Sequence, residues 1–226
     1  MPTVRPRACV LWTAVALMLS SCHAHGAAAG GDADMVCLVK TFRTGVGGMW
    51  LPVWRPYLLL KDGSAYENPK LAPDSFDLAS SRQSEARRWG TWTQQGSDRA
   101  ISMPGRAAMT SAQCLPPASG GTSIQGSYKH VGGGGNIVSG GQASFMRRDS
   151  YHFYSDGRFD SGSSSGLISP GASTTASDAG RAGHYLIHDY SIDLRYDDGS
   201  EVRLFFYADG ERLVHIGDED YVPAAD

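Results

Sequence analysis

The sequence predicts an all-β protein, and three observations support that prediction. No stretch after the N-terminal 35 residues keeps apolar residues at the spacing of an amphipathic helix. The chain contains 28 Gly and 11 Pro, and short β-branched or aromatic runs lie between turn signals. The segment YSIDLRYDDGSEVRLFF, residues 190–206, alternates apolar and polar residues on both sides of a central turn.

The N-terminus has the features of a secretory signal. Arg5 and Arg7 precede a short apolar run, and the segment ends in LSSC at Cys22. LSSC resembles the lipobox of bacterial lipoproteins, in which the cysteine carries the lipid, including palmitate, and the peptide is cut before it. The resemblance implies a signal peptide over 1–21 and a Cys22 lipid anchor in the membrane. The alternative is an ordinary signal peptide with a chance cysteine.

The residues that follow resemble a flexible tether. Residues 22–35 are small and poor in large apolar side chains. His23 follows the cysteine where inner-membrane lipoproteins carry Asp, so the resemblance implies a periplasm-facing outer-membrane location in a Gram-negative cell envelope. The remaining residues, 36–226, are long enough for one β-barrel-like domain.

Cys37 and Cys114 are the cysteines left after the signal peptide and the lipid-bearing Cys22 are set aside. An even pair in an oxidising compartment predicts a disulfide. The alternative is that each is a small buried apolar side chain.

Two similar phrases, YLLLKDGSAY (57–66) and YHFYSDGRF (151–159), predict two similar hairpins. A three-residue loop closed by Gly63 or Gly157 fits both. Leu59 then faces Ala65 with Tyr57 on their side, and Phe153 faces Phe159 with Tyr151 on theirs.

The segment 190–206 predicts a hairpin around the loop Asp197-Asp198-Gly199, because only that register keeps apolar residues on one face. The predicted cross-strand pairs are Tyr190–Phe206, Ile192–Leu204 and Leu194–Val202 on the apolar side, with Asp193–Arg203 and Arg195–Glu201 on the charged side. A further loop at 208–210 predicts Leu204 opposite Val214 and Val202 opposite Ile216.

The spacing after each phrase predicts an internal repeat. Gly90 follows Gly63 by 27 residues, and Gly183 follows Gly157 by 26. A glycine-x-aromatic strand and a second turn occur in both halves, so we expect duplicated hairpin units at about 45–112 and 126–222. The polar stretches 67–88, 130–144 and 160–181 are expected to be mobile surface loops.

The C-terminal pattern, from the DGRF hairpin through the glycine-x-Tyr strand to the closing strands, resembles the lipocalin-like (calycin-type) β-barrel domains of bacterial lipoproteins. The resemblance covers 126–222 and, more weakly, 45–112, and Gly48-Met49-Trp50 matches the family's first strand loosely. It implies an antiparallel meander closed into a barrel with an apolar interior. Two packed β half-domains or a sandwich are the alternatives.

No catalytic or metal-binding constellation is evident. A Gly-x-Ser-x-Gly match at 162–166 lacks the strand–helix context of a nucleophile elbow, and the Asp residues before glycine serve turns. His184 and His188, about 13 Å apart along a strand, are too distant to share an ion. We therefore expect no enzyme, no metal and no cofactor.

The remaining candidates are aromatic. Trp50, Trp54, Tyr57 and Trp89 provide a possible platform for an apolar ligand, and the alternative is that they form core. The expected function is a lipid-anchored, non-enzymatic binding module for a small apolar ligand or an envelope component. The alternative is a structural or interaction lipoprotein with a filled core and a protein partner. A net charge of −3 argues against nucleic-acid binding.

Overall fold

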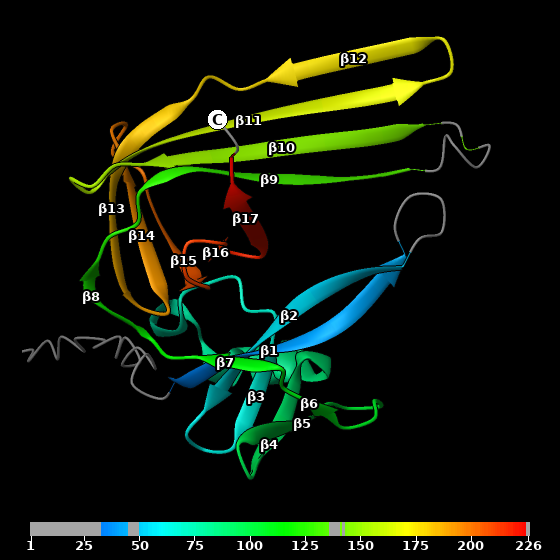
Figure 1. Cartoon of the computed structure of the whole chain (residues 1–226), viewed down its shortest axis with the longest axis vertical. Coiled ribbons are helices and arrows are strands. Elements are labelled where there is room, and N and C mark those ends of the chain that lie inside the picture. The colour runs from blue at the N-terminus through cyan, green and yellow to red at the C-terminus, as the bar shows by residue number, and fades with distance from the viewer. Residues whose placement is uncertain (1–32, 45–49, 136–140, 142, 225–226) are drawn as a thin grey trace, which may run out of the picture.

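The structure is a computed structural model that describes residues 33–44, 50–135, 141 and 143–224, and these form two antiparallel sheets (Figure 1). The all-β prediction is confirmed. The predicted signal peptide and Cys22 lie outside the described residues. The first strand begins at Ala33, inside the predicted tether.

Eight strands of the larger sheet close into a barrel, as expected. The strands pair in chain order, apart from an inserted β12 (Ala172–Ser177), and the last returns to the first. β8 (Ala118–Thr122) is not one of these eight strands, and it pairs with β13 (Arg181–Asp189). The barrel strands are β9 (Gly126–Gly135), β10 (Ser144–Phe153), β11 (Arg158–Ser169), β13 (Arg181–Asp189), β14 (Ser191–Tyr196), β15 (Glu201–Ala208), β16 (Val214–Ile216) and β17 (Glu219–Pro223).

The smaller sheet is a curled half-barrel with the spatial order β6-β5-β4-β3-β2-β1-β7. A short helix, α1 (Leu78–Ser84), begins at Asp77, whose carboxylate accepts a hydrogen bond from the Ser80 amide at 3.0 Å. The strands are β1 (Ala33–Thr44), β2 (Trp50–Leu60), β3 (Ser64–Glu67), β4 (Trp89–Gln95), β5 (Asp98–Ser102), β6 (Met109–Thr110) and β7 (Gln113–Leu115).

The hairpins at 57–66 and 151–159 have the predicted register. Leu59 lies opposite Ala65, and Phe153 lies opposite Phe159. The same chemistry holds both turns, because the Asp carboxylate accepts a backbone hydrogen bond two residues on. That distance is 2.8 Å for Asp62 and 3.1 Å for Asp156.

The strand after each hairpin joins it in the same way, which supports an internal repeat. The Trp92 amide donates to the Gly63 carbonyl at 2.9 Å, and the Tyr185 amide donates to the Gly157 carbonyl at 2.8 Å. Trp92 then pairs with Ile101, and Tyr185 pairs with Leu194, nine residues later in both cases.

Glycine is required at one matched position of each unit. A Cβ on Gly90 would lie 2.2 Å from the Ser102 carbonyl oxygen, and a Cβ on Gly183 would lie 2.2 Å from the Arg195 carbonyl oxygen. Backbone that close leaves no room for a side chain.

The 190–206 hairpin has the predicted pairs from Ile192–Leu204 to Arg195–Glu201. The prediction that Tyr190 shares the apolar face of these residues was wrong. The Phe206 amide bonds to the Tyr190 carbonyl at 2.9 Å, yet the Tyr190 ring packs in a different cluster from Phe206. Asp189 has a positive φ of 49°, and the chain turns there.

The register predicted for the hairpin between β15 and β16 was wrong by four residues. Ala208, not Leu204, lies opposite Val214, because the Asp209 amide bonds to the Leu213 carbonyl at 3.0 Å and moves the loop forward. Val214 and Ile216 still face the barrel interior, since an even shift preserves the face.

The expectation of a loop at 160–181 was also wrong. Most of these residues form β11 and β12, a long two-stranded arm whose backbone groups pair across the ribbon. Residues 67–88 contain α1 and two 3-10 turns, and β9 occupies 130–135 of the third polar stretch.

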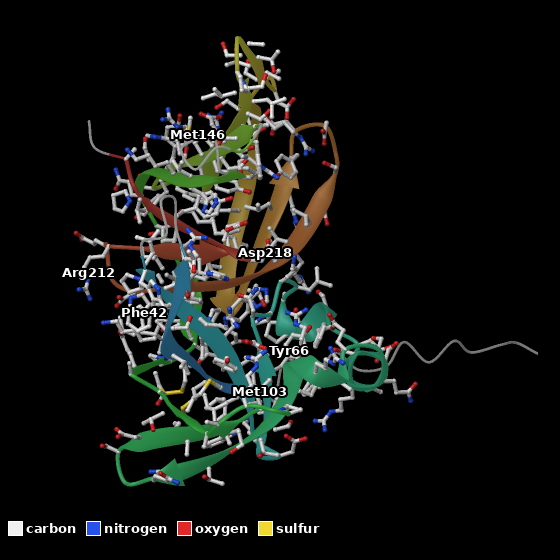
Figure 2. The ribbon with its side chains drawn as sticks, turned by 90° about the vertical axis from the view of Figure 1, so that its right-hand side faces the viewer. Phe42, Tyr66, Met103, Met146, Arg212 and Asp218 are labelled. Carbon is white, nitrogen blue, oxygen red and sulfur yellow. A yellow bond between two sulfur atoms is a disulfide. The ribbon has the colours of Figure 1, made fainter. Side chains whose placement is uncertain are left out.

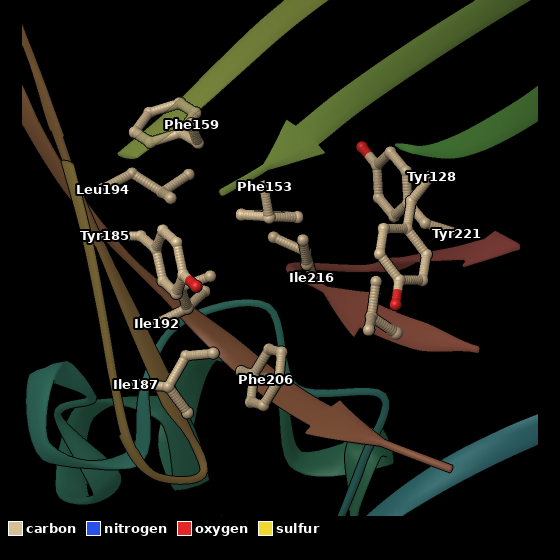
Figure 3. Close-up of a cluster of buried hydrophobic side chains, with 11 residues drawn as sticks. Tyr128, Phe153, Phe159, Tyr185, Ile187, Ile192, Leu194, Phe206, Ile216 and Tyr221 are labelled. Carbon is tan, nitrogen blue, oxygen red and sulfur yellow. The ribbon is translucent and has the colours of Figure 1, made fainter. Parts of the chain in front are cut away.

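Side chains fill the barrel interior (Figure 3). Aromatic and β-branched residues from all of its strands meet there, with Phe153 against Tyr185 at 5.0 Å between ring centroids. The buried members are Tyr128, Phe153, Phe159, Tyr185, Ile187, Ile192, Leu194, Phe206, Val214, Ile216 and Tyr221.

The outer face of β15 packs against the half-barrel. Phe205 and Tyr207 point away from the barrel interior and join a cluster with Leu58, Trp89 and other half-barrel residues. The buried Tyr190 hydroxyl donates to the Leu115 carbonyl at 2.8 Å and accepts from the Val36 amide at 3.2 Å. The two units are therefore joined by a buried, hydrogen-bonded contact.

The predicted disulfide is confirmed. Cys37 on β1 is bonded to Cys114 on β7, across a pair of directly opposed residues. The bond fixes the last strand of the half-barrel to its first.

Candidate functional site

A groove with a volume of about 760 Å³ lies between the half-barrel and the barrel. That volume is within the range of ligand pockets. Half-barrel residues line one wall: Arg43, Val53, Trp54, Arg55, Pro56, Glu67, Asn68, Lys70 and Arg88. Barrel residues line the other: Lys129, His130, Val131, His215, Asp218, Glu219, Asp220 and Val222. We call this concavity the inter-sheet groove.

Glu67 is the buried acid of the half-barrel wall. Its Oε1 accepts hydrogen bonds from Arg55 and Arg106, each at 2.6 Å, and from the Tyr57 hydroxyl at 3.2 Å. Burial opposes the charged form, but the bonds from Arg106 and Arg55 outweigh burial and hold the pKa of Glu67 below its usual value. The carboxylate therefore stays ionised and neutralised.

The barrel wall carries two histidine–acid pairs. His215 is buried, its Nδ1 lies 2.7 Å from the Asp220 carboxylate, and its ring stacks on Tyr207 at 4.6 Å. His130 Nε2 lies 3.4 Å from the Glu219 carboxylate. Across the groove, Lys70 of the half-barrel forms an ion pair with Asp218 of the barrel.

Each acid of the groove thus has a basic partner, whereas two cations of the groove have no acidic partner in the described part of the chain. Arg43 and Lys129 have no side-chain hydrogen bond or ion pair among the described residues. Basic groups without local partners favour a ligand that carries negative charge.

Apolar side chains are exposed beside these cations. Trp54 from β2 and Val131 and Val222 from the barrel wall are 43, 49 and 45 % exposed. Trp54 lies 5.8 Å below the Lys40 ammonium, in cation–π contact. The groove therefore offers an aromatic and aliphatic surface together with a positive charge.

Only one of the four aromatic candidates, Trp54, lines the groove. Trp50 is 76 % exposed at the start of β2 and lies outside it. Tyr57 is buried in the half-barrel core and contributes only through Glu67, and burial and Glu67 raise the pKa of Tyr57 to about 12. Trp89 belongs to the core between the units, where its indole N–H donates to Ser81 at 3.0 Å.

A smaller hollow of about 250 Å³ lies at the arm end of the barrel. Tyr151, Tyr196 and Tyr221 line it beside the Arg147–Asp149 ion pair, whose atoms are 2.7 Å apart. Its volume is below the range of most ligand pockets, so the inter-sheet groove is the stronger candidate.

Most groove residues were not identified from the sequence. Glu67 had a signal, since it is an acid at the end of a strand whose other residues are apolar or small. The run Asp218-Glu219-Asp220 is also visible as a cluster. Neither signal reveals which basic residues would lie opposite, because those come from distant strands.

The sequence match to a nucleophile elbow and the histidines and acids can be placed in the structure. The Gly-x-Ser-x-Gly match lies within extended β11, with Ser164 opposite Arg148 and Ser177. No three His, Cys, Asp or Glu side chains of the described ranges come together as metal ligands. Among the same residues, no helix has the length and apolar character to span a bilayer.

The chain matches no protein-family model, no curated protein and no solved structure. The lipoprotein and lipocalin-like resemblances therefore stay predictions, and the closed barrel stands on the structure itself.

Proposed function

We propose that this protein is a non-enzymatic binding protein of the cell envelope, anchored through Cys22, that holds a small amphiphilic anion in the inter-sheet groove. The observation that carries the proposal is the combination of exposed Trp54 with the unpartnered cations Arg43 and Lys129 in one concavity. A ligand with an acidic group and an apolar body satisfies both kinds of surface.

The filled barrel interior favours the groove over the barrel lumen as the ligand site. Eleven buried side chains occupy the space where a lipocalin-like protein would hold an apolar molecule. The two groove walls are held relative to each other by the buried cluster around Phe205 and Tyr207, with the Lys70–Asp218 ion pair across the groove, and this favours a preorganised site.

The test is native mass spectrometry of detergent-free protein, followed by thermal-shift titration with fatty acids, lysophospholipids and uncharged analogues. We expect a bound anionic amphiphile and a melting-temperature rise that uncharged analogues do not produce. Lys129→Ala should weaken binding about tenfold, since it removes one charge contact.

The matched control is Arg212→Ala, because Arg212 is an exposed cation whose partner Asp209 lies outside the groove. Equal losses for Lys129→Ala and Arg212→Ala, or an apo mass with no shift across the panel, would contradict the proposal.

A further inference from the structure

Three hairpins end on one side of the molecule and expose apolar side chains there. The ends of β1–β2, β9–β10 and β11–β12 all lie at the right in Figure 1. Viewed from that side, Figure 2 shows Met146 and Phe42 at two levels, with Asp218 of the groove at a level between them. We call the apolar residues of these three ends the tip face.

The tip face is unusually apolar for a surface. It includes Phe42, Trp50 and Leu51 from the first hairpin, with Trp50 76 % exposed. Phe145 and Met146 extend it on the second hairpin, and Leu167 and Ile168 on the third. Exposed apolar groups gathered on one side mark an interaction surface.

The strand segments next to the hairpin ends carry basic side chains and few acidic ones. The sequence has no Asp or Glu between Asp34 and Asp62, between Asp98 and Asp149, or between Asp160 and Asp178. These three stretches contain the hairpin ends, whereas Lys40, Arg43 and Arg148 lie within a few residues of the tips. In a protein of net charge −3, the hairpin ends are thus locally basic and aromatic, while the paired acid Asp218 of the groove lies at a level between them.

We propose that the tip face docks on an anionic lipid bilayer, as a membrane contact made by the protein itself and separate from acylation at Cys22. Trp50 has the amphipathic indole typical of groups that enter the headgroup region, and the apolar Phe42 ring lies 6.1 Å from it between ring centroids. Lys40, Arg43 and Arg148 attract anionic headgroups, each contributing within a Debye length of the surface. The end of the β11–β12 pair has no charged side chain, so it can enter the headgroup region without desolvating a charge.

The test uses the predicted mature chain, residues 22–226, with Cys22→Ser, so that neither an acyl chain nor the apolar segment 1–21 contributes. We expect cosedimentation with vesicles of phosphatidylglycerol and phosphatidylcholine in equal parts, and a blue shift of tryptophan fluorescence. Binding should fall at least tenfold on pure phosphatidylcholine or when salt rises from about 0.1 M to about 1 M.

Trp50→Ala should reduce binding to the anionic vesicles about tenfold, and Ile168→Ser should reduce it less. The matched control is Leu186→Ala, because Leu186 is an exposed aliphatic residue on β13, away from the tips. All variants should melt at the same temperature, since these side chains are exposed. Lys129→Ala should leave vesicle binding unchanged, which separates this contact from the groove.

Absence of vesicle binding, or equal losses for Trp50→Ala and Leu186→Ala, would overturn the proposal. A photo-crosslinker at position 50 that captures one envelope protein stoichiometrically, without any vesicle binding, would also overturn it and assign the tip face to a protein partner.

Discussion

In the half-barrel, strands β2 to β5 have the same register as β10, β11, β13 and β14 of the barrel, yet the two sheets are completed differently. After β14, three further strands return the barrel to β9. After β5, the half-barrel has the two-residue β6 and then β7. The Cys37–Cys114 disulfide holds β7 against β1. Similar units are thus closed by strands in one case, and in the other remain an open sheet whose last strand pairs with β1 and is also bonded to it by the disulfide.

The open form of the half-barrel has a functional consequence. Its β1 and β2 bury both faces where they meet the barrel, and they then continue past it to form one wall of the inter-sheet groove. The barrel has extensions of its own in β9–β10 and β11–β12, and the tip face combines them with the end of β1–β2.

The largest expected losses of stability come from two neighbouring residues, one in the contact between the two units and one inside the barrel. Phe205 packs between the units and Phe206 packs inside the barrel, and both are buried. Each change to Ala should destabilise the protein by about 3–5 kcal/mol. Hydrogen exchange should then accelerate at the contact with β1–β4 for Phe205→Ala, and within the barrel for Phe206→Ala. Identical exchange patterns would show that the units do not behave separately.

Removal of the disulfide should affect the half-barrel more than the barrel. Cys37→Ala with Cys114→Ala releases a cross-link between positions 77 residues apart, which corresponds to about 2–5 kcal/mol. Denaturant unfolding with and without reductant measures the loss, and exchange should rise first in β1 and β7. An unchanged midpoint after reduction would contradict the role assigned to the bond.

The matched glycines test the repeat. Gly90→Ala and Gly183→Ala should each cost about 1–3 kcal/mol, because the new methyl would meet backbone at 2.2 Å. Gly120→Ala is the control, since its Cβ would meet nothing within 4 Å. If only one of the first two variants is destabilised in thermal melts, the units are not equivalent.

The smallest effect is the pH dependence of Glu67. Its pKa is lowered in the folded protein, so its contribution to stability is complete above the unfolded pKa of about 4.3 and is lost as pH falls through the folded pKa. The size should be about 1 kcal/mol or less, because Arg55 and Arg106 remain partly exposed. Glu67→Gln should flatten the stability profile below pH 4.3, and an unchanged profile would exclude this role.

Local chemistry explains which parts of the fold could be predicted. Asp-Gly turns and alternation identified the 57–66, 151–159 and 190–206 hairpins, because those signals lie within a few residues. Tyr190 was misplaced because the alternation argument assumes a regular strand, whereas the chain turns at Asp189 and Tyr190 lies in that turn. The groove was missed for a related reason, since its walls meet only through packing between the two sheets.

The central claim is that ligand binds between the two sheets, and an amide chemical-shift titration with an anionic amphiphile tests it most directly. We predict perturbations on both walls at once, at Trp54 of β2 and at Lys129 and Val131 of β9, with the barrel interior around Phe153 and Leu194 unchanged. Perturbations centred on the barrel interior, or none at saturating ligand, would contradict the claim.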